Sequence, residues 1–147
     1  MMKKLILLTG LLLMASLLAA CGSSGLPKDA LDVSWEWSQL TETLPASQSV
    51  VPDPENYTLT FSADGTFALE ADCNLVSGEY EVEGDSLSLI LGPSTLAFCG
   101  EESLDTLYLQ LLGIVTSYEL ADGNLNLYLG EDIGKMVFAD GGAAEGN

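Results

Sequence analysis

The fold is decided by residues 57–69, which read Tyr-Thr-Leu-Thr-Phe-Ser-Ala-Asp-Gly-Thr-Phe-Ala-Leu. Apolar residues alternate with threonines up to position 61, and alternation resumes after Ala63-Asp64-Gly65. A period of two is typical of a strand with one buried face, and Asp-Gly favours a tight turn between two strands. The stretch therefore predicts an antiparallel β-hairpin.

The same pattern recurs on both sides of this hairpin. Alternating apolar residues flank turns at 83–85 and at Asp122-Gly123, which predicts two further hairpins. Residues 33–37 alternate with both tryptophans on one face, and residues 135–138 are typical of a last strand. The chain is therefore predicted to be mostly β, with about eight short antiparallel strands.

One segment changes to the spacing of a helix. Between Leu104 and Val115 the apolar residues recur at i, i+3, i+4, i+7, i+8 and i+11, which places them on one helix face. Three acids between 101 and 105 lie where negative charge suits the helix dipole, and Ser103 or a neighbour is expected to cap the helix. The pattern predicts a small antiparallel barrel packed with one amphipathic helix.

The remaining segments lack both patterns. Residues 21–31 contain Gly, Ser and Pro and are predicted to be a tether, whereas 41–55 hold three prolines and are predicted to be a long surface loop. Residues 140–147 have little to bury and are predicted to be a disordered tail. One domain is therefore expected at 32–139, because the chain is too short for two comfortable cores.

The amino terminus predicts export and lipid attachment. Lys3 and Lys4 precede an uncharged, mainly apolar stretch, and Leu18-Ala19-Ala20 directly precedes Cys21. The stretch is shorter than the ~20 residues of a membrane-spanning helix and ends in small residues, as a secretory signal does. Residues 1–20 are therefore predicted to be a lipoprotein signal peptide, with an uncleaved anchor as the alternative.

Processing at this motif would leave Cys21 with a diacylglycerol and an acylated amino terminus. Stable anchoring needs at least two acyl chains, and this arrangement supplies them. We therefore expect the protein in the cell envelope, lipid-anchored on the extracytoplasmic side of a membrane. Gly22 stands where an aspartate would resemble an inner-membrane signal, so the outer membrane is expected if the host has one, and the cell membrane otherwise.

Charge excludes several partners. The chain has 22 acidic residues against four lysines and arginines, with no histidine, and only Lys28 and Lys135 follow Cys21. Nucleic-acid binding needs basic side chains at the phosphates and is excluded, as is charge-driven attachment to anionic lipid. The scattered acids are interpreted as a solvated exterior, with weak cation binding as the alternative.

The lack of histidine also argues against an enzyme. It removes Ser-His-Asp and Cys-His catalysis, the usual imidazole base and nearly all zinc sites. Neither Lys28 nor Lys135 lies in a recognisable Ser–Lys motif, and Gly130–Gly134 is too short for a calcium loop. We therefore expect no catalytic residue, no metal and no cofactor.

Cys73 and Cys99 are the two cysteines that remain once Cys21 is used for lipid. An even pair in an exported domain favours a disulfide, because no reducing system outside the cytoplasm keeps thiols free. A bond between Cys73 and Cys99 is therefore predicted. Two buried free thiols are the alternative.

Three motifs follow the first hairpin: Ala-Asp-Cys-Asn at 71–74, Gly78-x-Tyr80, and Ser-Thr-Leu-Ala-Phe-Cys at 94–99. With them, the chain from 57 to 138 resembles the META domain family, that of the heat-inducible HslJ-type bacterial lipoproteins. The resemblance implies structural roles for the motif residues Asn74, Gly78 and Thr95. Asp72 and Phe98 depart from the family pattern, which more often has a glycine and a small residue at these places.

The resemblance also implies a lipocalin-like barrel without an established catalytic activity, in proteins associated with stress tolerance, drug tolerance or virulence. Asn74 is expected to bond the backbone at a strand bend. The expected function is a membrane-anchored, non-catalytic lipoprotein that binds an envelope protein or ligand. The alternative is a carrier of a small apolar ligand inside the barrel. Phe61, Phe67 and Tyr80 are bulky enough to fill a small barrel, which favours the first hypothesis.

Overall fold

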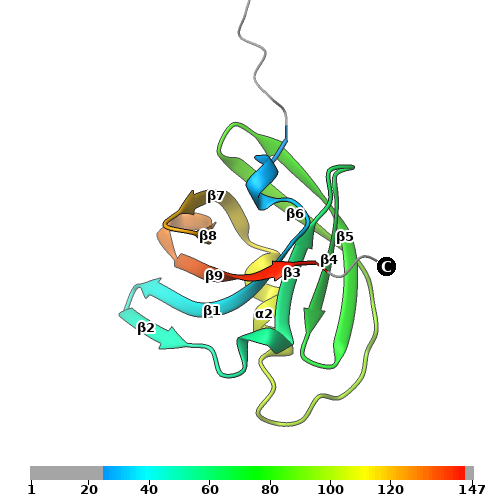
Figure 1. Ribbon diagram of the computed structural model, residues 1–147. Helices are drawn as coiled ribbons and strands as arrows, with labels where there is room; N and C mark the ends of the chain where they lie inside the picture. The colour runs from blue at the N-terminus through cyan, green and yellow to red at the C-terminus, as the bar shows by residue number, and fades with distance from the viewer. Residues whose placement is uncertain (1–24, 145–147) are drawn as a thin grey trace, which may run out of the picture.

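The computed structural model describes residues 25–144, which form a nine-stranded antiparallel sheet and one α-helix (Figure 1). The predicted class, mostly β with one helix, is confirmed, although the sheet has one strand more than expected. The elements are η2 (Lys28–Ala30), β1 (Val33–Thr43), β2 (Ala46–Val50), η3 (Pro54–Asn56), β3 (Tyr57–Phe61), β4 (Thr66–Ala71), β5 (Asn74–Glu83), β6 (Ser86–Ser94), α2 (Asp105–Leu112), β7 (Val115–Ala121), β8 (Asn124–Leu129), η4 (Gly130–Asp132) and β9 (Gly134–Ala143).

The sheet closes into a ring because β1 has neighbours on both sides. The strand order is β2-β1-β3-β4-β5-β6-β7-β8-β9, and β1 also pairs with β9. The pairing with β9 extends along β1 from Val33 to Glu42. In contrast, β6 and β7 share the single pair Ser86↔Ser117. The ring is therefore continuous at β1 and weakly joined between β6 and β7.

The first hairpin forms where the sequence predicts it. Buried residues on β3 alternate with half-buried threonines, and buried residues on β4 alternate with exposed ones. In the turn, Gly65 has a φ of +88°, a region that glycine enters without strain. Asp64 Oδ1 accepts hydrogen bonds from Thr66 N–H at 3.0 Å and from Thr66 Oγ1 at 2.6 Å. Turn chemistry and hydrophobic pattern therefore specify the same register.

Aromatic side chains fill the interior of the ring. Trp37 stacks on Tyr108 with 5.3 Å between ring centroids and meets Tyr57 edge-on at 6.0 Å. Trp35 is also buried, and its Nε1 donates a hydrogen bond to Ala30 O at 3.0 Å. Both tryptophans of β1 therefore face the core, as predicted.

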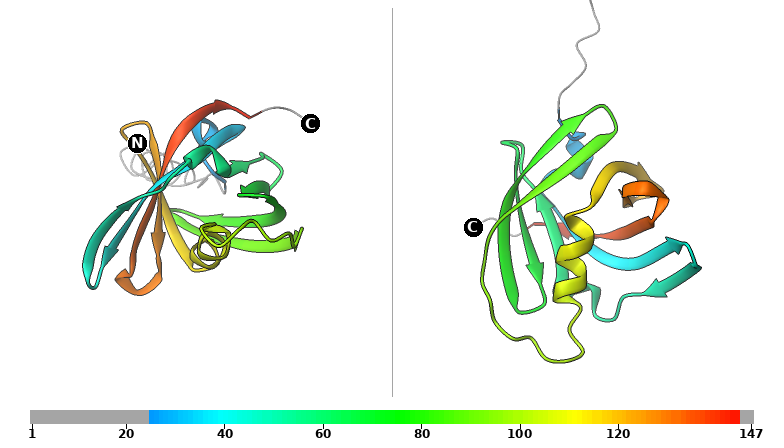
Figure 2. Two further views of the ribbon diagram at one scale, coloured as in Figure 1. Left: turned by 90° about the horizontal axis from the view of Figure 1, so that it is seen from below. Right: turned by 180° about the vertical axis from the view of Figure 1, so that it is seen from behind.

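The helix α2 lies between the β4–β6 strands and the β7–β9 strands (Figure 2, right). It is shorter than the predicted 104–115, because Val115 already belongs to β7. Two of its own side chains, those of Tyr108 and Leu112, are fully buried in the core. Ser103 Oγ accepts a hydrogen bond from Asp105 N–H at 3.2 Å, at the start of the helix. In residues 25–144, no helix combines the length and the apolar character that crossing a membrane requires.

Three predicted boundaries are wrong in part. The supposed loop at 41–55 contains the end of β1 and all of β2, and residues 140–143 of the supposed disordered tail belong to β9. Backbone pairing with β1 orders both segments, although their side chains carry no strand pattern. The supposed tether already enters the core, since Leu26 is buried. The predicted signal peptide, Cys21 and residues 145–147 lie outside the described residues.

Candidate functional site

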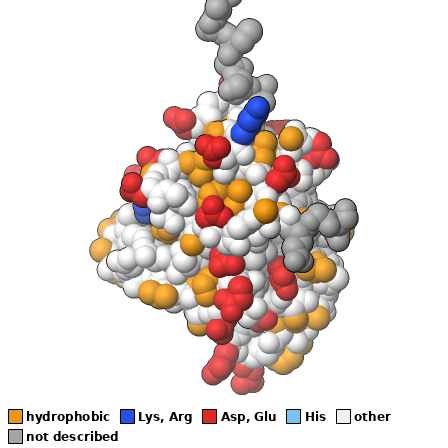
Figure 3. Space-filling view, in the orientation of Figure 1, with side chains coloured by type: hydrophobic (Ala, Val, Ile, Leu, Met, Phe, Trp, Pro, Cys, Tyr) orange, Lys and Arg blue, Asp and Glu red, His pale blue; other side chains and the backbone are white. Residues whose placement is uncertain are grey.

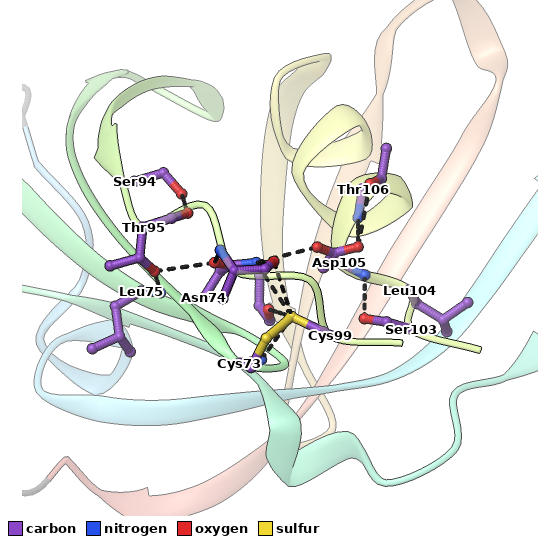
Figure 4. Close-up of a disulfide and its surroundings, with 12 residues drawn as sticks. Cys73, Asn74, Leu75, Ser94, Thr95, Cys99, Ser103, Leu104, Asp105 and Thr106 are labelled. Carbon is purple, nitrogen blue, oxygen red and sulfur yellow. Dashed lines mark hydrogen bonds between the residues drawn. A yellow bond between two sulfur atoms is a disulfide. The ribbon is translucent and has the colours of Figure 1, made fainter. Parts of the chain in front are cut away.

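The motif cysteines and Asn74 meet where the segment between β6 and α2 passes the turn from β4 to β5 (Figure 4). We call this segment, residues 95–104, the 95–104 loop. Cys73 in the turn forms a disulfide with Cys99 in the loop, and their Cα atoms are 5.5 Å apart. The bond therefore links the loop to the sheet across 26 residues of sequence.

Asn74 binds the loop through its side-chain amide (Figure 4). The side chain is buried, and its Oδ1 accepts hydrogen bonds from Ala97 N–H at 2.8 Å and from Thr95 Oγ1 at 3.1 Å. Its Nδ2 donates to Ala97 O at 3.0 Å and to Asp105 Oδ2 at 3.2 Å. One amide therefore binds both backbone groups of Ala97 and also contacts the start of α2.

Thr95 makes a second connection between the loop and β5. Leu75 N–H donates to Thr95 Oγ1 at 2.9 Å, and Thr95 N–H donates to Leu75 O at 3.1 Å. Thr95 is thus bound to the sheet at both Asn74 and Leu75, and Ala97 is bound at Asn74. The disulfide at Cys99 adds a third restraint two residues further on.

The side chains between these restraints point into solvent. Leu96 is 94% exposed and Phe98 is 84% exposed, although both are large and apolar. They flank Ala97, whose backbone is bound to Asn74. Leu75, next to the loop, is also exposed. Large apolar side chains that an ordered segment keeps exposed are candidates for an interaction site.

Acidic residues lie close to this apolar pair along the chain and at the neighbouring turn. Glu101 and Glu102 in the loop are exposed, and Asp72 precedes the disulfide. A run of acidic side chains extends from the middle of the face in Figure 3 to its lower end, where the loop lies in Figure 1. The 95–104 loop therefore carries two exposed apolar side chains followed by two exposed acidic ones.

Two tyrosines connect the end of the loop and the helix α2 to β3. Leu104 N–H donates a hydrogen bond to Tyr57 Oη at 2.9 Å, and Tyr108 Oη donates to Thr58 O at 3.0 Å. Burial raises the pKa of the Tyr108 hydroxyl well above its ordinary value of 10.0. Tyr108 therefore stays protonated at neutral pH and remains a hydrogen-bond donor.

Not all of the predicted site residues lie in this cluster. Cys73, Asn74, Thr95 and Cys99 meet, whereas Gly78 lies further along β5 and serves packing. A Cβ at Gly78 would lie 2.3 Å from Ile90 O and 2.5 Å from Phe67 Cζ, so only glycine leaves room for the Phe67 ring. Cys21, the predicted lipidation site, lies outside the described residues.

Sequence reasoning missed three contributors to the site. Ala97 acts through its backbone, which leaves no sequence signature, and the contact of Asp105 with Asn74 joins residues 31 apart. The exposed pair was also missed, since Leu96-Ala97-Phe98 alternates as a half-buried strand does. The one available signal was Phe98 itself, which departs from the small residue more common in the family.

A second surface feature lies across the ends of β1, β7, β8 and β9. It is an open groove of about 540 Å³ lined mainly by hydroxyl side chains and by Lys135. Lys135 Nζ donates a hydrogen bond to Asn126 Oδ1 at 2.9 Å and lies 5.7 Å from the centre of the Tyr128 ring. The hydrogen bond with Glu119 raises the pKa of Tyr128. Within residues 25–144, no three His, Cys, Asp or Glu side chains are grouped as metal ligands would be.

Comparisons with known proteins agree with this architecture. The family model of the META domain matches residues 29–141. No curated protein matches the chain. The fold is similar to that of a DUF4847 family protein from Bacteroides vulgatus, with a TM-score of 0.60 and 13% identity over 75% of this chain and 93% of that one. It is also similar to a protein from Burkholderia xenovorans, with a TM-score of 0.59 and 22% identity over 76% of this chain and 83% of that one.

Proposed function

Because the chain belongs to the META domain family, we propose that it is a lipid-anchored envelope protein that binds another envelope component and catalyses no reaction. One observation carries this proposal: Leu96 and Phe98 are held in solvent by a disulfide and by the amide of Asn74. A stress- or drug-tolerance role, which the family resemblance implies, would be exerted through the bound component.

The position of the loop supports binding away from the anchoring membrane. The first described segment, with η2, lies at one end of the molecule in blue, and the 95–104 loop lies at the opposite end (Figure 1). The predicted anchor at Cys21 precedes Gly25 by only four residues. A domain anchored there would direct Leu96 and Phe98 away from the lipid, toward a partner in the envelope space.

The side chains of the 95–104 loop indicate the chemistry of the partner. Two apolar side chains call for an apolar cleft, and the acids at 101 and 102 call for basic residues around it. With 22 acids in the chain, an anionic polymer is repelled. We therefore propose a protein partner with an apolar cleft and a basic rim.

The filled interior favours surface binding over the carrier alternative. Trp37, Phe61, Phe67 and Tyr108 are buried inside the ring, and the stacked and edge-on aromatic pairs occupy its centre. A carrier needs a continuous apolar cavity of roughly 300 Å³ or more. Binding at the exposed loop needs no such cavity.

Two measurements test the proposal. Metabolic labelling with a fatty-acid analogue should tag the wild-type protein and not the Cys21→Ser variant; equal labelling would refute the anchor. A photo-crosslinking amino acid at position 98 should give one discrete adduct in cells, and Leu96→Ser should abolish it. Ile90→Ser removes an exposed apolar side chain outside the loop and is the matched control. An adduct that survives Leu96→Ser would refute binding at the loop.

A further inference from the structure

The strand β2 leaves one edge of the sheet open. In the sheet formed by residues 25–144, every other strand has neighbours on both sides, whereas β2 pairs with β1 alone. All five residues of β2, Ala46-Ser47-Gln48-Ser49-Val50, are exposed and uncharged. Exposed edges are usually protected by charges or bulges, because their unpaired backbone groups invite another strand.

The hydrogen bonds of the hairpin show which backbone groups are free. Val51 N–H donates to Ser38 O at 3.0 Å, in the same register that pairs Ser49 with Leu40. Hydrogen-bonded pairs alternate along an antiparallel ladder, so Ser47 and Ser49 direct their N–H and C=O groups toward β1. Gln48 and Val50 therefore direct theirs toward the open edge, together with Ala46.

Other features limit how an added strand can dock. Pro45 and Pro52 bracket β2, so the accessible edge is about five residues long. Val50 is 81% exposed and offers an apolar contact beside the free backbone groups. The hairpin projects from the side of the ring, away from the 95–104 loop (Figure 1). A segment that docks on β2 therefore does not occupy the loop.

Charge around the edge selects the partner. Glu42 lies opposite Ser47 in the hairpin, and Asp53 and Glu55 follow β2 directly. The net charge of the chain is −18, and residues 46–50 contain no base. We propose that β2 accepts, by strand addition, an extended segment of a partner protein that carries lysine or arginine at both ends of a short uncharged core.

A second copy of this chain fits the edge poorly. Pairing β2 with β2 would bring both copies of Glu42, Asp53 and Glu55 to the same place, with like net charges behind them. Like charges across an interface disfavour association, whereas a basic segment turns the same acids into attraction. Strand addition on β2 is independent of the partner proposed for the 95–104 loop.

The test uses the full chain in detergent micelles and three fluorescent peptides. The first is Lys-Val-Thr-Val-Thr-Val-Lys, the second has glutamate at both ends, and the third is the lysine peptide with the backbone nitrogens of its five core residues methylated. We expect the lysine peptide to bind at least tenfold more tightly than the other two, measured by anisotropy. Hydrogen exchange should slow in residues 44–52 when the lysine peptide is bound.

Two variants locate the contact. Gln48→Pro removes one outward N–H and no hydrogen bond to β1, and should weaken binding at least about fivefold, the effect of one net hydrogen bond. Gln48→Lys keeps the backbone and repels the lysine peptide, whereas Gln48→Thr is the control that retains affinity. Phe98→Ser should change nothing, which separates this surface from the loop.

Several outcomes would overturn the proposal. Equal binding of the lysine and glutamate peptides would remove the charge argument, and exchange protection outside residues 44–52 would place the contact elsewhere. Unchanged affinity in Gln48→Pro would show that the edge makes no backbone bonds. Dimers that form without peptide and disappear in Gln48→Pro would assign the edge to a second copy.

Discussion

Replacing Asn74 with aspartate tests whether its amide organises the 95–104 loop. The substitution keeps the shape of the side chain and exchanges the donating Nδ2 for an oxygen. That nitrogen lies 3.0 Å from Ala97 O and 3.2 Å from Asp105 Oδ2, and both of these are acceptors. Asn74→Asp therefore places an anionic oxygen against a carbonyl and a carboxylate in a buried position.

The size of the effect follows from these distances. Two ionised oxygens 3.2 Å apart repel by about 5 kcal/mol at an effective dielectric constant of ~20. Asp105 is half-buried and can turn toward solvent, so about half of this repulsion should remain. Loss of the amide's hydrogen bonds alone costs about 2 kcal/mol, since net values are ~0.5–1.5 kcal/mol per bond and water can reach Ala97. We expect destabilisation of about 2 kcal/mol for Asn74→Ala and about 4 kcal/mol for Asn74→Asp at pH 7.

The pH dependence identifies the cause. The carboxyl group introduced at position 74 should have a folded-state pKa above its unfolded value of ~3.9, because Asp105 and Ala97 O disfavour its charge. Both states are protonated below the unfolded value, so Asn74→Asp should be no less stable than Asn74→Ala there, and the destabilisation that its charge causes should vanish. It should grow as the pH rises and become constant above the folded-state pKa.

The measurement is urea unfolding followed by tryptophan fluorescence, with both variants and the wild type at pH 3.5 and pH 7. The carboxylates that do not contact position 74 are common to the two variants, so they cancel in the comparison. Equal stability of Asn74→Asp and Asn74→Ala at pH 7 would show that the nitrogen of Asn74 does not face Asp105. If Asn74→Asp is still the less stable of the two variants at pH 3.5, charge is excluded as the origin of the difference.

Three further predictions concern the disulfide, Gly78 and Asp64. Cys73→Ala and Cys99→Ala should each lower the free energy of unfolding by about 3.5 kcal/mol, the chain-entropy value for a 26-residue loop. The double variant should lose hardly more, because the same bond is removed in each case. Additive losses in urea unfolding would contradict a shared bond. Gly78→Ala should lower the free energy of unfolding by about 3 kcal/mol, because the methyl group would overlap Ile90 O. The control Gly113→Ala, with its nearest contact at 3.5 Å, should lower it by under about 1 kcal/mol. Similar losses of stability in the two variants would refute the packing role of Gly78. Hydrogen bonds from the side chain and backbone of Thr66 lower the pKa of Asp64 below 3.8, so Asp64 stabilises the hairpin at neutral pH and loses this contribution as the pH falls through its folded-state pKa. A carboxyl titration by NMR should show this pKa rising in Thr66→Val, and an unchanged value would refute the assignment.

The sequence predicts the elements whose side chains alternate and misses those held by backbone pairing. Tyr57–Phe61 and Thr66–Ala71 form the predicted hairpin because burial, turn residues and register agree there. Ala46–Val50 has no buried side chain, and two prolines flank it, so its pairing with β1 leaves no pattern to read. Residues 140–143 also pair with β1 through their backbone. Their side chains are mainly exposed, so they too show no strand pattern in the sequence.

The candidate site divides in the same way. Cysteine and asparagine are recognisable in the motifs, so Cys73, Asn74 and Cys99 could be singled out in advance. The partners of Asn74 could not be predicted from the sequence, because they are the backbone atoms of Ala97 and a carboxylate on α2. The exposure of Leu96 and Phe98 depends on these contacts, and it therefore emerges only from the folded chain.

The restraints on the loop favour binding over a purely structural role. Ordering the backbone of residues 95–99 costs about 5–10 kcal/mol. The disulfide contributes about 3.5 kcal/mol, and the hydrogen bonds of Asn74 and Leu75 contribute about 1 kcal/mol each, which roughly offsets that cost. A loop that only connects β6 to α2 could remain mobile. It would then need neither the entropy cost of ordering nor the disulfide and hydrogen bonds that offset this cost. Here the ordered loop keeps Leu96 and Phe98 in solvent, so a partner that buries them meets residues already fixed in place and loses less conformational entropy on association.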